Sequence, residues 1–274
     1  MKNILVPTDF SACAQNAARA AIMLAAQAKA DIHFLHIMPG TGEEVHVPRV
    51  SKIPIHNSQE EHANNELNLL VASASQGGLK AFPMLVFDKG NERIENYVKR
   101  LNIDLIIMGS HGATGIRELI IGSNTQRVVR NSSVPVLVIK RTISVQLKIK
   151  SIVFASTFKE DVSKAFEFVV NLAQLFKSSV DILFINFIDK MTDEESIEDI
   201  VQNLTKRYPN VSFTSSTAEA NDKEWGIHQF IEMVNADMVA LTTYDKTGFL
   251  GRRSVAEDMV NHEEIPVLVI GNVN

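Results

Sequence analysis

Short, continuous apolar runs alternate along this chain with longer stretches in which apolar residues recur at helical spacing. The runs predict buried strands, because a strand covered on both faces has no need of polar alternation. In the first half such runs lie at residues 4–6, 105–108 and 134–139, and a further strand-like segment lies at 31–36. The stretches at 11–29, 58–75 and 92–101 carry their apolar residues on one face and predict amphipathic helices. Strands alternating with helices predict an α/β fold with right-handed crossovers and an open parallel sheet.

The same order of strand-like segments occurs twice. Residues 4–10 align with 152–158, 31–36 with 181–186, 104–108 with 237–241, and 134–139 with 265–270. Four matching segments in one order predict two copies of a domain. The charged segment 140–150 forms the junction, so we expect domains at 1–145 and 146–274.

One loop of the first half has a pattern that suits a phosphate. Gly109 and Gly112 follow a predicted buried strand, and nine residues later Gly122 and Ser123 precede a predicted helix. Glycines let backbone N–H groups approach an anion, and a helix N-terminus adds a favourable dipole. The Walker A lysine and the tight three-glycine dinucleotide fingerprint are both missing. We therefore expect a different kind of phosphate site, at the carboxyl ends of the strands.

Ser123 by itself does not decide between a ligand and a helix cap. Ser123 with Gln126 fits a capping box, in which the serine hydroxyl accepts from the helix and the glutamine reaches back. Ser254 with Glu257 fits the same box in the second half. The glycines, rather than the serine, therefore point to the phosphate.

The spacing G-x2-G-x9-G-S, the run at 134–139 and the opening segment 4–11 together resemble the ATP-binding universal stress proteins. The resemblance implies that adenosine lies near the ends of the first two strands and that the triphosphate follows the glycine loop. The implied ligand is ATP, with or without Mg²⁺. It also implies that the two halves pair within one chain through their last strands, 136–139 and 267–270. A homodimer of the whole chain is left open.

Carried over residue by residue, the resemblance assigns ten positions. Pro7, Thr8 and Asp9 would flank the adenosine, although Asp9 fits equally well as a cap on the following helix. The other contacts would come from the end of the second predicted strand, the end of the predicted strand at 105–108 and the loop: apolar contact from Ile37, backbone groups from Met108 and Gly109, and phosphate contacts from Gly112, Gly122, Ser123 and Asn124.

The second half departs from this pattern at each critical position. Gly109 becomes Thr242, Gly112 becomes Asp245, Gly122 becomes Arg253, and Asp9 becomes Thr157. Side chains at former glycines would crowd a phosphate. We expect one ATP site per chain, in the first half, and interpret Arg252 and Arg253 as a solvated or ion-paired basic pair rather than a second anion site.

Composition narrows the class of protein. A net charge of −5 without a dense basic stripe argues against nucleic acid. The lone Cys13 excludes an intrachain disulfide and suits a reducing cytosol. No signal peptide and no apolar run of membrane length is expected, which predicts a cytoplasmic protein without membrane contact. His46, His56 and His62 do not have the spacing of a metal site, so none is assigned.

Three functions are compatible with the sequence. The first is an ATP-binding regulatory or stress-response protein. The second is a weak ATPase or a nucleotidyl-transfer enzyme, but no carboxylate cluster near the loop offers a base and a metal scaffold, so efficient turnover is not expected. The third is a dimer-like scaffold that needs no nucleotide, and the intact glycines of the first half count against it.

Overall fold

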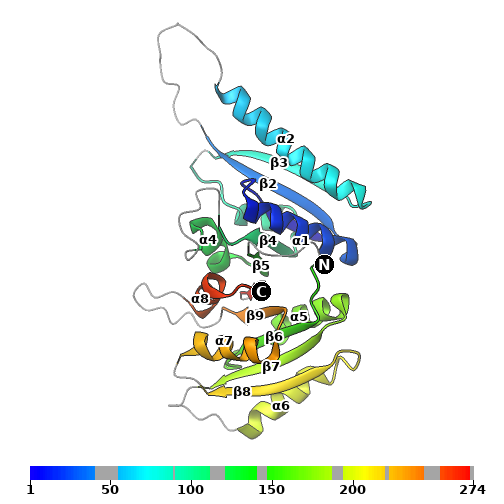
Figure 1. The fold of residues 1–274 in the computed structure, drawn as a ribbon, viewed down its shortest axis with the longest axis vertical. Coiled ribbons are helices and arrows are strands. Elements are labelled where there is room, and N and C mark those ends of the chain that lie inside the picture. Colours follow the sequence, from blue (N-terminus) through cyan, green and yellow to red (C-terminus); the bar gives the residue numbers. More distant parts are fainter. Residues whose placement is uncertain are drawn as a thin grey trace.

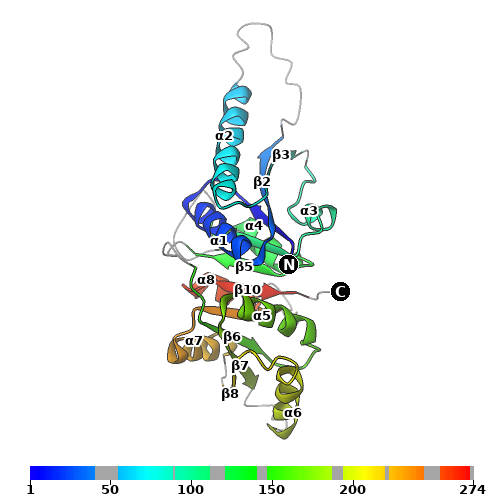
Figure 2. The same ribbon diagram turned by 90° about the vertical axis from the view of Figure 1, so that its right-hand side faces the viewer.

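One ten-stranded sheet runs the length of the molecule, and helices cover both of its faces (Figures 1 and 2). The structure is a computed structural model that describes residues 1–40, 55–88, 90–111, 121–140, 147–186, 194–219, 222–243 and 254–271. The strand order is β3-β2-β1-β4-β5-β10-β9-β6-β7-β8. The order of the first five strands therefore recurs, reversed in direction across the sheet, in the last five.

The first half alternates five strands with four helices among the described residues. Its elements are β1 (Asn3–Pro7), α1 (Ala12–Ala28), β2 (Asp31–Pro39), α2 (Ile55–Gln76), β3 (Ala81–Asp88), α3 (Glu95–Arg100), β4 (Leu105–Gly109), α4 (Ser123–Asn131) and β5 (Val136–Ile139). The second half repeats this order with β6 (Ser151–Ser156), α5 (Ser163–Phe176), β7 (Ser179–Asn186), α6 (Glu194–Thr205), β8 (Phe213–Glu219), α7 (Lys223–Val234), β9 (Met238–Thr242), α8 (Val255–His262) and β10 (Val267–Ile270).

The predicted α/β fold with two tandem open parallel sheets is confirmed, with one addition. Each half has a fifth strand, β3 or β8, that the apolar pattern did not reveal. Both are edge strands, so neither is covered like a central one. β3 contains Pro83 and a half-exposed, non-alternating run, and β8 is rich in Ser and Thr. Pro is tolerated at such an edge because it lacks the N–H that a central strand would need on both sides.

Within each half every strand pairing is parallel, and the halves meet in an antiparallel pair. β5 and β10 align Val138 with Val267, Leu137 with Leu268, and Val136 with Val269. These strands are fully buried. The two parallel sheets thereby become one continuous sheet.

Alternation along each strand divides the apolar residues between two cores. In β1, Ile4 and Val6 face α1, whereas Leu5 faces α3 and α4. The first core lies under α1, α2, α5 and α6, and the second under α3, α4, α7 and α8. Both cores extend across the β5–β10 pair.

Small hydrogen-bonded details recur in the two halves. Asp104 accepts from the backbone amides of Lys2 and Asn3, and Asp237 accepts in the same way from residues 150 and 151. Phe10 and Phe158 both have positive φ, at 63° and 52°. Each of their amides donates to a hydroxyl two residues earlier, on Thr8 or Ser156. The repeat thus extends from the strands to individual turns.

An ion pair joins helices of the two halves. The Arg130 guanidinium donates to both carboxylate oxygens of Glu257, at 2.5 and 2.9 Å. Glu257 is 1% exposed, and it also accepts from Gln126 and from the Ser254 amide. Burial alone would raise the pKa of Glu257, but the hydrogen bonds from Arg130, Ser254 and Gln126 together hold it below its ordinary value.

Replacing Arg130 with Met tests this ion pair. At pH 7 we expect the free energy of unfolding to fall by about 3 kcal/mol, because a buried carboxylate loses its cation. A lowered pKa in the folded state stabilises the protein above the unfolded value of 4.5, and this stabilisation is lost as the pH falls through the folded pKa. The difference between wild type and variant, measured from urea midpoints, should therefore shrink as the pH falls below about 4.

Arg207→Met is the matched control, since Arg207 is an exposed arginine just beyond α6. It should shift stability by no more than about 0.5 kcal/mol. A difference for Arg130→Met that did not change with pH would contradict the assigned role of Glu257.

Candidate functional site

A cleft of about 490 Å³ opens at the carboxyl ends of β1, β2 and β4. Its volume lies within the range of about 300–1,000 Å³ that is common for small-molecule sites. In open α/β sheets, ligands bind at this edge, where neighbouring connections leave the sheet in opposite directions. The first residues of α4 and the segment before α3 complete its wall.

The cleft brings together residues that the sequence analysis selected from separate segments. Every one of the ten except Gly112 lines it: Pro7, Thr8, Asp9, Ile37, Met108, Gly109, Gly122, Ser123 and Asn124. Gly112 lies outside the described residues, as do Asp245, Arg252 and Arg253. The shared location is a structural finding, while the contact of each residue with a nucleotide remains a prediction.

The start of α4 differs from the prediction. The expected capping box of Ser123 and Gln126 is wrong: Gly122 is the N-cap residue, and Ser123 is already the first helical residue. Gly122 adopts an extended conformation, with φ −60° and ψ 142°, and has no side chain to bond the amides of the first turn. Gln126 instead hydrogen-bonds to Glu257 of the second half. The first turn of α4 therefore faces the cleft without a side-chain cap.

Gly122 also has a role other than the predicted phosphate contact of its backbone amide. Its amide donates to the backbone oxygen of Ser110, at 2.9 Å. That N–H is thus already used inside the protein and is not directed at a ligand. The next amides along the chain, those of Ser123 and Asn124, have no acceptor within the helix because they precede the first i to i−4 bond.

The need for glycine at position 109 comes from packing. A Cβ placed there would lie 2.9 Å from both the backbone carbon and the Cβ of Cys13 on α1. The Gly109 carbonyl accepts from the buried Thr125 hydroxyl at 2.9 Å, which ties α4 to the end of β4. Gly109 lines the cleft, but the close approach of α1 already explains the residue type.

Asp9 supports the turn before α1 and is not the cap of that helix, which was the structural alternative that the sequence left open. Its Oδ1 accepts from the Ser11 amide at 3.0 Å, and Ser11 is the N-cap of α1. The imidazole of His36 lies beside the same turn, with Nδ1 2.7 Å from the Thr8 carbonyl oxygen and its ring 4.5 Å from that of Phe10.

Charged residues that the sequence analysis did not select also line the cleft: Arg93, Arg127, Asp88 and Glu92. Arg127 lies one turn after Ser123 on α4, so the i, i+4 spacing could have revealed it. Its Nε is 3.7 Å from a carboxylate oxygen of Glu95, too far for a hydrogen bond, and finds no hydrogen-bond partner among the described residues. Backbone hydrogen bonds from Glu92 and Gly90 lower the pKa of Asp88.

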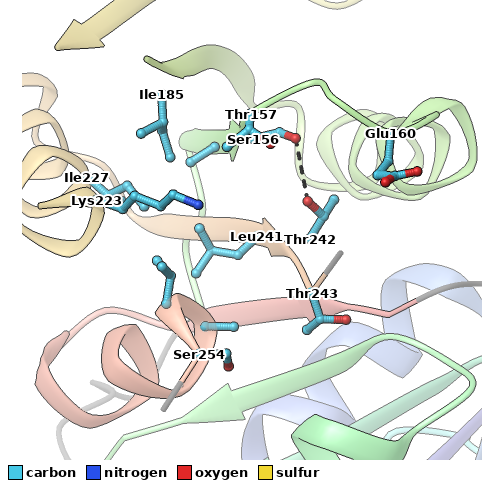
Figure 3. A pocket seen from close by; sticks show the side chains of 13 residues that line it. Ser156, Thr157, Glu160, Ile185, Lys223, Ile227, Leu241, Thr242, Thr243 and Ser254 are labelled. Carbon is cyan, nitrogen blue, oxygen red and sulfur yellow. Dashed lines mark hydrogen bonds between the residues drawn. The ribbon is translucent and has the colours of Figure 1, made fainter. Parts of the chain in front are cut away.

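The corresponding place in the second half holds a much smaller pocket, whose lining side chains are drawn in Figure 3. The pocket there holds about 30 Å³, room for little more than one water. Thr242 faces Ile270 in the sheet as Gly109 faces Ile139, and its hydroxyl lies 3.5 Å from that of Ser156. The Lys223 side chain reaches in from α7 (Figure 3).

The helix that begins at this pocket is capped by its own side chains. Ser254 accepts from the Glu257 amide, and Glu257 reaches back to the Ser254 amide. The capping box predicted for Ser254 and Glu257 is therefore confirmed. The equivalent helices α4 and α8 thus differ at their N-termini, because α8 has a side-chain cap and α4 has none.

Among the described residues, no three His, Cys, Asp or Glu side chains gather as metal ligands would. The side chains of His46 and His56 lie outside that part of the chain, and His62 lies near Phe10, with its ring 6.4 Å away. No helix in the described part is long and apolar enough to span a bilayer.

The fold and the cleft define an open-sheet α/β protein with a cleft at the carboxyl ends of its strands. Residues 1–140 match the Universal stress protein family. The chain belongs to this family.

Individual relatives agree with this assignment. Universal stress protein MJ0577 of Methanocaldococcus jannaschii is 29% identical, over 51% of this chain and 95% of the relative. Universal stress protein MJ0531 of the same organism is 28% identical, over 51% of this chain and 82% of the relative. The crystal structure of a universal stress protein from Archaeoglobus fulgidus covers 98% of both chains with a TM-score of 0.75 and 19% identity, which shows that the fold is shared.

Gly109→Ala tests the packing role of this glycine. We expect it to lower the free energy of unfolding by about 1–3 kcal/mol, because the new methyl group would overlap Cys13. Urea unfolding followed by circular dichroism measures the change. Gly77→Ala is the control, since its Cβ would meet only the Ala74 oxygen at an ordinary 3.4 Å. Equal stability of the two variants would contradict the packing role.

Proposed function

We propose that this chain binds ATP, with or without Mg²⁺, in the cleft of its first half and acts as a stress-response regulatory protein with nucleotide occupancy as its signal. The proposal concerns binding rather than efficient turnover. The family membership supports a nucleotide ligand, because the glycine spacing of this chain resembles that of the ATP-binding members. The buried free thiol of Cys13 supports a cytoplasmic setting.

The contrast between the two helix starts carries the proposal. Four amides at the start of any helix need acceptors from outside it. In α8 the capping box of Ser254 and Glu257 supplies acceptors for two of these amides, beside a pocket of about 30 Å³. In α4 the cap is Gly122, which offers none, beside a cleft of about 490 Å³. A bound phosphate would supply the missing acceptors of α4 and interact favourably with its dipole.

The remaining lining residues suit the rest of the nucleotide. Arg127 and Arg93 would add positive charge near the phosphates, and Ile37 would give the adenine an apolar contact. Asp9 would accept from a ribose hydroxyl or the adenine amine while keeping the Ser11 amide. Each hydrogen bond to a charged phosphate would contribute about 1.5–3 kcal/mol.

We propose the same division of the chain as the sequence predicts, with an ATP-binding domain at 1–145 and a degenerate domain at 146–274. The recurring strand order and turn geometry support two copies. The antiparallel pairing of β5 with β10 supports an internal pair in which the second copy is a structural partner.

Calorimetric titration with MgATP tests the stoichiometry, using full-length protein freed of nucleotide by denaturation and refolding. We expect one site per chain, because the counterpart pocket is too small for a nucleotide. Two sites would contradict the assignment of the second half. No binding would favour the nucleotide-independent scaffold.

Ser123→Glu separates binding from folding. A carboxylate at the first position of α4 interacts favourably with the helix dipole, so stability should hold or rise by about 0.3–1 kcal/mol. The same charge would repel the phosphates, and ATP affinity should fall at least tenfold, roughly 1.4 kcal/mol. Titration and thermal unfolding give the two readouts.

Ser163→Glu is the matched control. It makes the same substitution at the first position of α5, in the second half. ATP affinity should then stay within about twofold of wild type, because exposed charges beyond a Debye length are largely screened. Unchanged ATP affinity in Ser123→Glu would remove the start of α4 from the site.

A further inference from the structure

Helix α8 of the second half contacts α4 of the first half at both ends. Near the C-terminal end of α4, Arg130 pairs with Glu257. Just before its N-terminal end, the Ile121 amide donates to the Asn261 side-chain oxygen at 2.6 Å. Glu257 and Asn261 lie four residues apart and so share one face of α8. The two helices lie side by side where the halves meet (Figure 1).

The contact at Asn261 is buried. Asn261 is 3% exposed and Ile121 is 4% exposed. The ammonium group of Lys140, directly after β5, donates to the Asn261 backbone oxygen at 2.5 Å. Two groups of the first half therefore converge on one residue of the second, in surroundings where an unmade hydrogen bond is costly.

This contact fixes the direction of the chain immediately before the proposed phosphate site. The Ile121 amide points to Asn261, and the next amide, that of Gly122, points to Ser110. The following amides, of Ser123 and Asn124, belong to residues that line the cleft. Two successive amides held by protein acceptors orient the peptide planes that follow, so Asn261 contributes to where the first turn of α4 is aimed.

We propose that Asn261 is a positioning residue for nucleotide binding, through which the half that binds no nucleotide orients the phosphate-binding end of α4 in the half that does. The inference rests on the ATP site proposed above. Asn261 acts through Ile121 and Gly122 and need not touch the ligand. By linkage, bound ATP would in turn strengthen the contact between α4 and α8.

The chemistry of Asn261 allows a test that separates positioning from mere stability. Among the described residues its Nδ2 has no hydrogen-bond partner, so the acceptor oxygen is the part of the side chain in use. Asn261→Asp keeps an acceptor in nearly the same shape, beside the positive charge of Lys140. Asn261→Leu keeps the approximate volume but removes the acceptor.

MgATP titration of the full-length variants, at a temperature where each is folded, gives the primary readout. We expect about tenfold weaker affinity for Asn261→Leu, the effect of losing one hydrogen bond that orients the site. Asn261→Asp should remain within about threefold of wild type. If Asn261→Leu does not fold, Asn261→Ala takes its place, because it removes the acceptor without adding bulk.

Ser178→Ala is the control for stability. The Ser178 hydroxyl is buried in the second half and donates to the Ile149 carbonyl, away from α4. Its loss should lower the melting temperature while leaving ATP affinity unchanged. Amide hydrogen exchange at Ile121 gives a second readout that needs no nucleotide, and exchange there should be faster in Asn261→Leu than in Ser178→Ala.

The possible outcomes separate the two proposals. Wild-type binding with unchanged affinity in Asn261→Leu would overturn the positioning role and leave the ATP site intact. An affinity loss in Ser178→Ala as large as that in Asn261→Leu would also overturn it, because the effect would follow stability. Absence of ATP binding by wild type would overturn both.

Discussion

The antiparallel pairing of β5 with β10 is the interaction on which the rest of the molecule depends. Each half alone would end in a short, apolar strand with one edge unpaired. Such an edge exposes backbone donors and acceptors and invites pairing with another chain. In this protein the partner is the corresponding strand of the same chain, in a register that aligns Leu137 with Leu268. The pairing makes both cores continuous and brings α4 against α8.

The contact between α4 and α8 joins two helices that differ in how they begin. α4 and α8 occupy equivalent places, and each must satisfy the free amides at its start. α8 satisfies two of them with its own capping box, in which Glu257 also accepts from Arg130. α4 has a glycine as its N-cap, and its first turn faces a cleft. The helix start with a side-chain cap thus belongs to the second half, and the one without belongs to the half that is proposed to bind nucleotide.

Buried polar groups also gather at the seam, the region where β5 and α4 of the first half meet β10 and α8 of the second. Glu257, Asn261 and Lys140 are all buried, and each has a hydrogen-bond partner across the seam. Buried polar groups need specific geometry to avoid a desolvation cost, whereas apolar contacts tolerate sliding. Such groups can therefore set how the two halves fit, while the apolar strands supply most of the favourable burial.

The sequence alone determined the features that depend on local pattern. Apolar runs marked central strands, helical spacing marked α1, α2 and α3, and the repeated order of strand-like segments predicted two copies. Glycine spacing selected positions that the structure brings to one cleft, because the ends of parallel strands lie at one edge of a sheet. The apolar pattern did not predict the two edge strands, because β3 is interrupted by Pro83 and β8 is rich in Ser and Thr.

Only the tertiary structure decided which residue performs which physical role. The sequence indicated Ser123 as the N-cap of α4, whereas the N-cap is Gly122 and Ser123 is the first helical residue. Gly109 was selected for a phosphate, yet the approach of Cys13 explains why it is glycine. Asn261 could not be found at all, because it meets Ile121 across 140 residues of chain. Burial and periodicity can be predicted from residues that are close in the sequence. A hydrogen bond between distant segments is set only when those segments pack together.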